Sequence, residues 1–125
     1  MSRFACLNAA VCDEASAATT LRAKSAEWLQ LTMQVGQRAV GNAEEVGAAA
    51  YDYLFYSGYV TLAYWWARSV VAADASSQTA AFKQAKRDTA RFYFARVLPR
   101  TRTHAEAIAS GAAPLMSMDA GAFGT

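Results

Sequence analysis

The first 40 residues carry an apolar stripe with the spacing of a helix. Apolar and small residues recur alternately three and four positions apart, which is the heptad pattern of a helix that packs along its length. The pattern predicts a helix over about residues 4–40, with Ser2 as its N-cap. Glu14 departs from the pattern and marks a local break or a second start. The stripe consists of Phe4, Leu7, Val11, Glu14, Ala18, Leu21, Ser25, Trp28, Thr32, Val35 and Ala39.

The next stretch, over about residues 43–73, is the most apolar part of the chain. No charged residue lies between Asp52 and Arg68. A surface helix has one apolar stripe, whereas this helix is apolar on nearly every side and must be covered all round. We therefore predict that it is the central helix of a bundle.

The connections between the helices are short. Gly41 ends the first helix, and Asn42 followed by Glu45 resembles a capping box at the start of the second. Ser76 or Ser77 is the expected cap of the third helix.

A third helix is predicted over about residues 77–110, with Gly111 as its stop. Pro99 lies inside this helix, where it removes one backbone hydrogen bond. We expect a kink near residues 95–98.

These elements predict an all-α fold, a single domain over residues 1–125. Short loops make sequential helices antiparallel neighbours, so the fold is an up-down-up bundle of three long helices. Residues 111–125 form an irregular C-terminal tail. Its apolar side chains could dock elsewhere: Leu115, Met116, Met118 and Phe123.

Two neighbours cannot cover all sides of the middle helix, so some of its aromatic residues should lie outside the core. Aromatic side chains are favoured in protein interfaces, and we predict that this helix forms one. The predicted interface residues are Tyr53, Phe55, Tyr56, Tyr59, Tyr64, Trp65 and Trp66. Gly58 is expected where another helix packs closely. An aromatic core without an outside partner is the competing interpretation.

Composition narrows the class of protein. Hydrophobic residues make up 54% of the chain and charged residues 18%, with a net charge of +2. The chain is long enough for a core without disulfides or metals. Cys6 and Cys12 with a single histidine do not form a zinc pattern, and they fit the reducing cytoplasm. The uncharged run Tyr53–Ala67 is shorter than the roughly 20 apolar residues of a membrane span.

Basic residues gather on the third helix. Lys83, Arg87 and Arg91 are four residues apart and share one face. Such a face can follow a phosphate backbone, although acidic residues earlier in the chain balance it. This balance therefore favours protein contacts over nucleic acid.

Candidate catalytic chemistry is sparse. His104 is the only histidine, and no cysteine or serine is placed as its obvious partner. The sequence contains none of the patterns GxGxxG, GxxxxGK[ST], GxSxG or HExxH. The aromatic cluster could line a pocket for a small molecule, but a core or an interface is its commoner use.

Three stretches resemble the C-terminal helical domain of long bacterial acyl-CoA dehydrogenases. They are GAAAYDYLFYSGYVTLAYWWARSV, AFKQAKRDTARFYFARVLPR and APLMSMDAGAF. That family carries Tyr-Leu and Ala-Arg on the second helix, Ala-x-Phe-Tyr and Leu-Pro on the third, and an acidic-Ala-Phe close. The matches are Tyr53-Leu54, Ala67-Arg68, Ala90-Arg91-Phe92-Tyr93, Leu98-Pro99 and Ala122-Phe123. The close departs from the pattern, because Gly121 precedes the alanine and the acid is Asp119.

The resemblance covers about residues 10–125 and implies a parent enzyme that uses FAD to desaturate an acyl-CoA thioester. In such enzymes a carboxylate removes the α-proton while the β-hydrogen passes as hydride to the flavin. That machinery belongs to preceding domains, and no position here matches the catalytic glutamate or the flavin contacts. We therefore expect no catalytic, cofactor-binding or metal-ligating residue in this chain.

On this interpretation the chain is a non-catalytic C-terminal part of a longer cytoplasmic enzyme. It would serve assembly, contacting the dehydrogenase body or a second subunit of a homo-oligomer. The alternative is a free-standing helical module that binds a small apolar ligand or nucleic acid.

Overall fold

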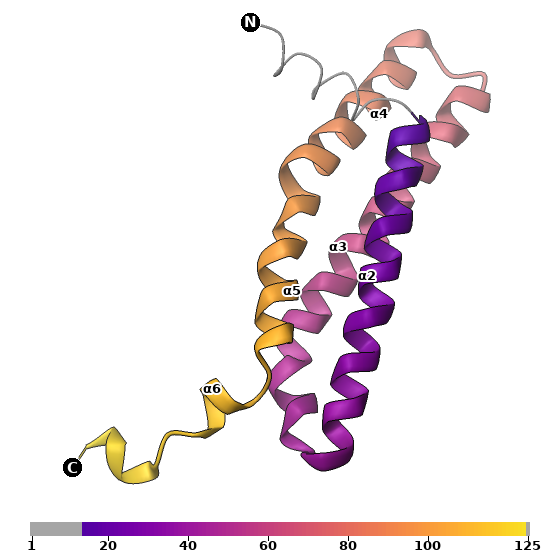
Figure 1. Ribbon diagram of the computed structural model, residues 1–125. Coiled ribbons are helices and arrows are strands. Elements are labelled where there is room, and N and C mark those ends of the chain that lie inside the picture. The colour runs from indigo at the N-terminus through magenta and orange to yellow at the C-terminus, as the bar shows by residue number, and fades with distance from the viewer. Residues whose placement is uncertain (1–13, 125) are drawn as a thin grey trace, which may run out of the picture.

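The computed structural model describes residues 14–124, and this part of the chain is helical with no strand. Helix α2 (Glu14–Gly41) runs antiparallel to α3 (Glu44–Ala75), and a bent third segment returns beside both (Figure 1). The predicted all-α, up-down-up bundle is confirmed. The expected N-cap Ser2, the stripe residues before Glu14 and both cysteines lie outside the described residues.

The third segment is not one regular helix. It comprises α4 (Ala80–Phe92), a π-helical turn (Tyr93–Val97), a 3₁₀ turn (Leu98–Arg100) and α5 (Thr101–Ser110). In the π turn the Leu98 N–H donates to the Tyr93 carbonyl, five residues back. Pro99 has no N–H to donate, so the regular ladder cannot continue through this point. The kink predicted over residues 95–98 is therefore confirmed.

The helix ends differ in part from the predictions. Gly41 ends α2 as expected, and Asn42 Oδ1 accepts a hydrogen bond from the Glu44 N–H at 3.1 Å. The predicted cap at Ser76 or Ser77 is wrong. Thr79 caps α4, because its side chain accepts from the Phe82 N–H at 3.2 Å. Ser76 instead donates to the carbonyl of Ala73, in the last turn of α3.

Helix α3 lies between the other two and makes most of the contacts that join them. Its residues Tyr56, Val60 and Ala63 are buried against Leu31 of α2. From the third segment, aromatic and aliphatic side chains close the core: Tyr93, Phe94, Leu98, Ala105 and Ile108. The bend at Pro99 is therefore part of the core, because Leu98 beside it is only 2% exposed.

The end of α5 is tied to the end of the bundle where α2 passes into α3. Glu45 does not complete the predicted capping box with Asn42, because its Oε2 accepts from the Ala112 N–H at 3.1 Å. Arg38 Nη1 donates to the Ile108 carbonyl at 3.3 Å. The Ile108 carbonyl and the Ala112 N–H, at the end of α5, thus have hydrogen-bond partners on α2 and α3.

Beyond Ala112 the chain leaves the bundle (Figure 1). It forms only α6 (Ala113–Met116) and a 3₁₀ turn (Ala120–Phe123). Its large apolar side chains are all exposed: Leu115, Met116, Met118 and Phe123. Docking of this tail stays a prediction.

Replacing Gly111 with alanine should destabilise the fold. Gly111 has φ 74° and ψ −170°, a conformation that is essentially restricted to glycine. An added Cβ would also lie 3.3 Å from Glu45 Oε2 and 3.4 Å from Arg38 Nη1. We expect Gly111→Ala to lower the free energy of unfolding by about 1–3 kcal/mol in urea titrations. Gly41→Ala is the matched control and should cost nothing, because no atom lies within 4 Å of its added Cβ. Equal stability of the two variants would contradict this account.

Candidate functional site

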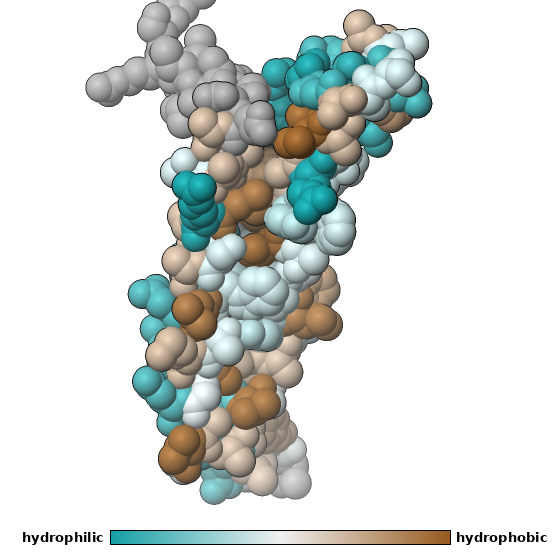
Figure 2. Space-filling model, turned by 90° about the vertical axis from the view of Figure 1, so that its right-hand side faces the viewer, coloured by the Kyte–Doolittle hydropathy of each residue, from teal (hydrophilic) through white to brown (hydrophobic). Residues whose placement is uncertain are grey.

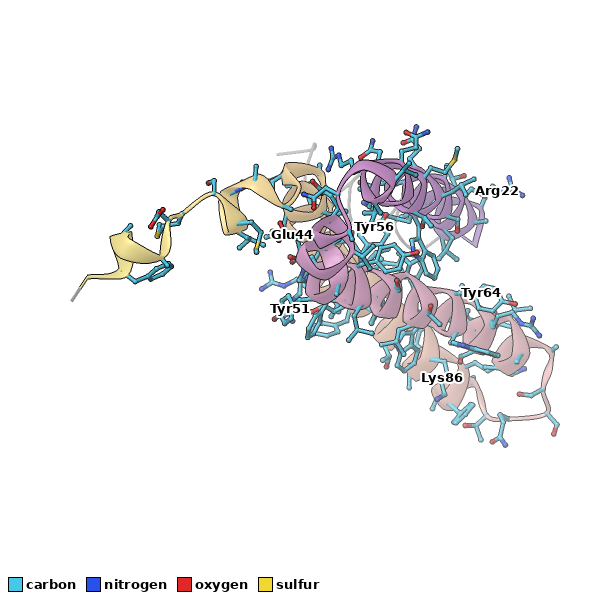
Figure 3. The ribbon with its side chains drawn as sticks, turned by 90° about the horizontal axis from the view of Figure 1, so that it is seen from below. Arg22, Glu44, Tyr51, Tyr56, Tyr64 and Lys86 are labelled. Carbon is cyan, nitrogen blue, oxygen red and sulfur yellow. The ribbon has the colours of Figure 1, made fainter. Side chains whose placement is uncertain are left out.

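One flank of α3 is left largely uncovered by α2 and the third segment, which meet it only at its edge, where Phe55 contacts His104. Residues that recur with helical spacing on this flank are apolar and exposed, and we call them the outer face of α3. Leu54 is 69% exposed, Tyr51 66% and Trp65 56%. The outer face comprises Gly47, Tyr51, Leu54, Phe55, Gly58, Leu62 and Trp65. Figure 3 shows Tyr51 on the side of α3 that points away from α2.

The predicted interface residues divide between this flank and the core. Phe55, Tyr64 and Trp65 are exposed, which confirms that some of the aromatic residues lie outside the core. Tyr53, Tyr59 and Trp66 are half-buried and pack against it. Tyr56 is 0% exposed, so its prediction as an interface residue is wrong. The sequence analysis missed Tyr51, Leu54 and Leu62, although their spacing around Gly58 could have indicated them.

Gly58 does not lie at a close contact between helices of this chain. It is exposed, and no atom lies within 4 Å of a Cβ built at this position. The predicted close packing at Gly58 is therefore wrong for the chain alone. The reason is the rotation of α3, which turns Gly58 away from both neighbouring helices. Gly47, on the same flank, is equally open.

Tyr56 is held in the core by a polar network with α2. Its hydroxyl donates to Glu27 Oε2 at 2.8 Å, and Lys24 Nζ donates to the same oxygen at 2.7 Å. Burial, together with the Glu27 carboxylate, raises the pKa of Tyr56 well above its ordinary value. Burial alone would raise the pKa of Glu27, but hydrogen bonds from Lys24 and Tyr56 and the charge of Lys24 lower it. The network sets the rotation of α3 against α2, with Tyr56 pointing toward α2 (Figure 3).

A second buried tyrosine joins α3 to the third segment. The Tyr93 hydroxyl donates to the Tyr59 carbonyl at 2.8 Å. Burial and the neighbouring Tyr59 raise the pKa of Tyr93 to about 12. Tyr93 thus stays neutral and works as a hydrogen-bond donor.

His104 has a partner that the sequence analysis missed. Its Nδ1 lies 2.8 Å from Asp52 Oδ1, and its ring stacks on Phe55 with centroids 5.5 Å apart. A carboxylate that orients an imidazole is one half of a nucleophile-activating arrangement. Within the described residues no hydroxyl or thiol completes it with a hydrogen bond to His104. The pair therefore serves to join α3 to α5.

A hollow lies where α2, α3 and α4 meet, and we call it the three-helix cavity. Its volume is about 310 Å³. Apolar side chains form its walls, among them Leu21, Ala67, Val71 and Phe94. Arg68, Arg87 and Arg91 also line it, together with Asp74. Figure 2 shows hydrophobic side chains gathered in a hollow in the upper part of this face, with hydrophilic ones on both sides.

Three basic residues of α4 have acidic or carbonyl partners, whereas Lys86 Nζ lies over the rings of Trp66 and Phe82. Arg87 Nη2 lies 2.5 Å from Asp74 Oδ1, and Arg91 Nη1 lies 3.0 Å from Asp88 Oδ1. Lys83 Nζ donates to the Asp74 carbonyl at 3.1 Å.

No helix between residues 14 and 124 combines the length and hydropathy that crossing a bilayer requires. In the same range, histidine, cysteine and acidic side chains do not gather in threes as metal ligands would.

The chain matches a known protein family. Residues 4–119 match the model of the family described as acetyl-CoA dehydrogenase C-terminal like. Neither the curated proteins nor the solved structures contain a significant match to the chain.

The network around Glu27 predicts how stability depends on pH. The pKa of Glu27 is lowered on folding from its ordinary value of 4.5, so its contribution is present above that pH. It is lost as the pH falls through the lower, folded value. We expect the free energy of unfolding to fall more steeply below about pH 4.5 for the wild type than for Glu27→Gln. Urea titrations across this range measure both curves, with Tyr56→Phe expected between them. Parallel curves would contradict the assignment.

Proposed function

Because the chain belongs to the family of acetyl-CoA dehydrogenase C-terminal-like domains, we propose that it is the non-catalytic helical domain of an FAD-dependent acyl-CoA dehydrogenase. Its role is assembly, through contacts with the dehydrogenase body or with a second subunit. The parent enzyme desaturates acyl-CoA thioesters in the cytoplasm. Acid–base and hydride chemistry then belong to the rest of that enzyme.

The outer face of α3 is the observation that carries this proposal. Leu54, Leu62 and Trp65 are each more than half exposed in the chain alone. Contiguous apolar surface of this kind usually marks an interface, since burying it removes apolar area from water. Tyrosine and tryptophan are the side chains that interfaces favour.

The glycines of the outer face support a helix or a backbone as the opposing surface. Gly58 has open space where a side chain would stand, and so has Gly47 eleven residues earlier on the same flank. Small residues let two backbones approach closely. A mid-helix glycine costs about 1 kcal/mol relative to alanine, and a close contact with a partner offsets that cost.

The three-helix cavity, as its described residues line it, does not fit a flavin. The three-helix cavity, at about 310 Å³, lies at the lower limit of pockets for small ligands and is too small for a dinucleotide. The sequence also lacks the glycine-rich turn that receives a pyrophosphate. No reaction step is therefore assigned to the residues of this chain.

The charges favour a protein partner over a nucleic acid. None of the outer-face residues is charged, and the sequence between Asp52 and Arg68 contains no charged residue. Binding to nucleic acid depends on basic residues at the contact surface. Arg87 and Arg91 of α4 lie instead beside Asp74 and Asp88.

Serine substitutions on the outer face should abolish association without unfolding the chain. We expect the isolated wild-type chain to self-associate, and Leu54→Ser with Trp65→Ser to be monomeric. Leu29→Ser with Met33→Ser is the matched control, because these residues are similarly exposed but lie on α2. Light scattering at several concentrations measures the effect. In the full-length enzyme the same outer-face pair should weaken contact with the dehydrogenase body or the second subunit. The proposal would be overturned if the wild-type chain were monomeric and also did not bind the dehydrogenase body.

Two substitutions at Gly58 distinguish an effect on folding stability from an effect on association. Gly58→Ala should raise the free energy of unfolding of the chain by about 0.5–1 kcal/mol, because helix propensity improves and nothing is displaced. The bulkier Gly58→Leu should weaken association. Gly36→Ala on α2 is the control: it is equally exposed and open, so it should gain stability and leave association unchanged. Urea titration and light scattering measure the two effects. Weaker folding of Gly58→Ala would mean that this flank is covered within the chain.

A further inference from the structure

The three-helix cavity is separate from the outer face of α3 and is not used by the proposed function. Its walls come from three helices: Leu21 from α2, Ala67 and Val71 from α3, and Ala90 from α4. Alanines stand at several of these positions, including Ala17 and Ala18. Protein interiors are otherwise packed to the density of organic crystals, so larger side chains at these alanines would fill the space. The sequence therefore keeps a hollow of about 310 Å³ with mostly apolar walls.

The polar residues of the cavity have a positive balance. Among the described residues that line it, three are arginines and one, Asp74, carries a carboxylate. Arg87 pairs with Asp74, and Arg91 pairs with Asp88. Arg68 differs from both, because its Nη1 donates to the hydroxyl of Tyr64 at 2.9 Å. Among the described residues no carboxylate forms an ion pair with Arg68.

Two contacts with Tyr64 hold the guanidinium of Arg68 in place. Its guanidinium also lies over the Tyr64 ring, 5.8 Å from the centroid. A guanidinium has five N–H donors, so one bond to a phenol leaves donors for a ligand. The fork of these donors matches the two oxygens of a carboxylate. An apolar hollow with a positively charged edge thus complements a molecule with an apolar tail and an anionic head.

We propose that the three-helix cavity binds a free medium-chain carboxylate. The tail lies along Leu21, Ala67, Val71 and Phe94, and the carboxylate pairs with Arg68. If each carbon of the tail takes about the 30 Å³ of a liquid water molecule, the cavity holds a chain of roughly ten carbons. A neutral tail would leave Arg68 without its anion, and a cationic head would be repelled by the three arginines.

Decanoate is the probe for this site. Titration calorimetry on the whole chain should show saturable binding of decanoate. Decyltrimethylammonium, with the same tail and the opposite charge, should bind at least tenfold more weakly. Butyrate, with the same head and a short tail, should also bind far more weakly, because it buries less apolar surface.

Methyl NMR locates the bound ligand. Decanoate should shift the methyl signals of Leu21 and Val71 in the cavity. Leu54 and Leu62 on the outer face serve as internal controls and should stay unchanged. Shifts at Leu54 and Leu62 alone would place the ligand on the outer face and overturn the cavity assignment.

Two kinds of variant test the residues. Arg68→Gln should weaken decanoate binding about tenfold or more, the loss expected when a hydrogen bond to a charged group is removed. Arg102→Gln, an exposed arginine on α5, is the matched control and should bind like the wild type. Ala67→Leu should abolish binding by filling the cavity, and Ala18→Leu does the same from α2 if the first variant folds poorly.

The results of the decanoate-binding experiments do not depend on the proposed assembly role. Absence of decanoate binding by the folded chain would overturn the proposal, as would equal affinity for the cationic probe or full binding by both filled variants. Serine variants of the outer face should bind decanoate normally, so a failure of self-association would leave this inference standing.

Discussion

A single geometric constraint governs this structure: α3 is apolar all round, but between residues 14 and 124 only α2 and the bent third segment pack against it. Tyr56, Val60 and Ala63 take the side that α2 and the third segment cover, and they form the core. The polar network of Tyr56, Glu27 and Lys24 fixes that choice, because a buried hydroxyl must find a partner. The exposure of the outer face of α3 follows from this rotation.

The opposite flank accordingly carries apolar surface that residues 14–124 leave exposed. Leu54, Leu62 and Trp65 stand in water around Gly58, where a partner backbone could approach. The chain belongs to the family of acetyl-CoA dehydrogenase C-terminal-like domains, and the proposed assembly role gives this surface a partner. The proposed assembly role thus rests on uncovered apolar area and not on any reactive group.

The third segment shows how a local defect shapes the core. Pro99 interrupts the hydrogen-bond ladder, and the π turn before it brings Tyr93 and Phe94 inward. Before this bend, α4 meets α2 and α3 at the three-helix cavity. After it, α5 is tied down by the Asp52–His104 pair and by Glu45 at Ala112. The bend therefore separates a tightly joined end of the bundle from the end that keeps a hollow.

The sequence by itself determined the three helices, their antiparallel order, the bend at Pro99 and the stop at Gly111. These depend on local periodicity and on the backbone chemistry of single residues. Only the tertiary structure decided that Tyr56 faces inward and Tyr51 outward, that Gly58 is open, and that Asp52 meets His104. A helix that is apolar on every side has no periodicity to set its rotation. Its orientation comes from residues on other helices, which lie far away in the sequence.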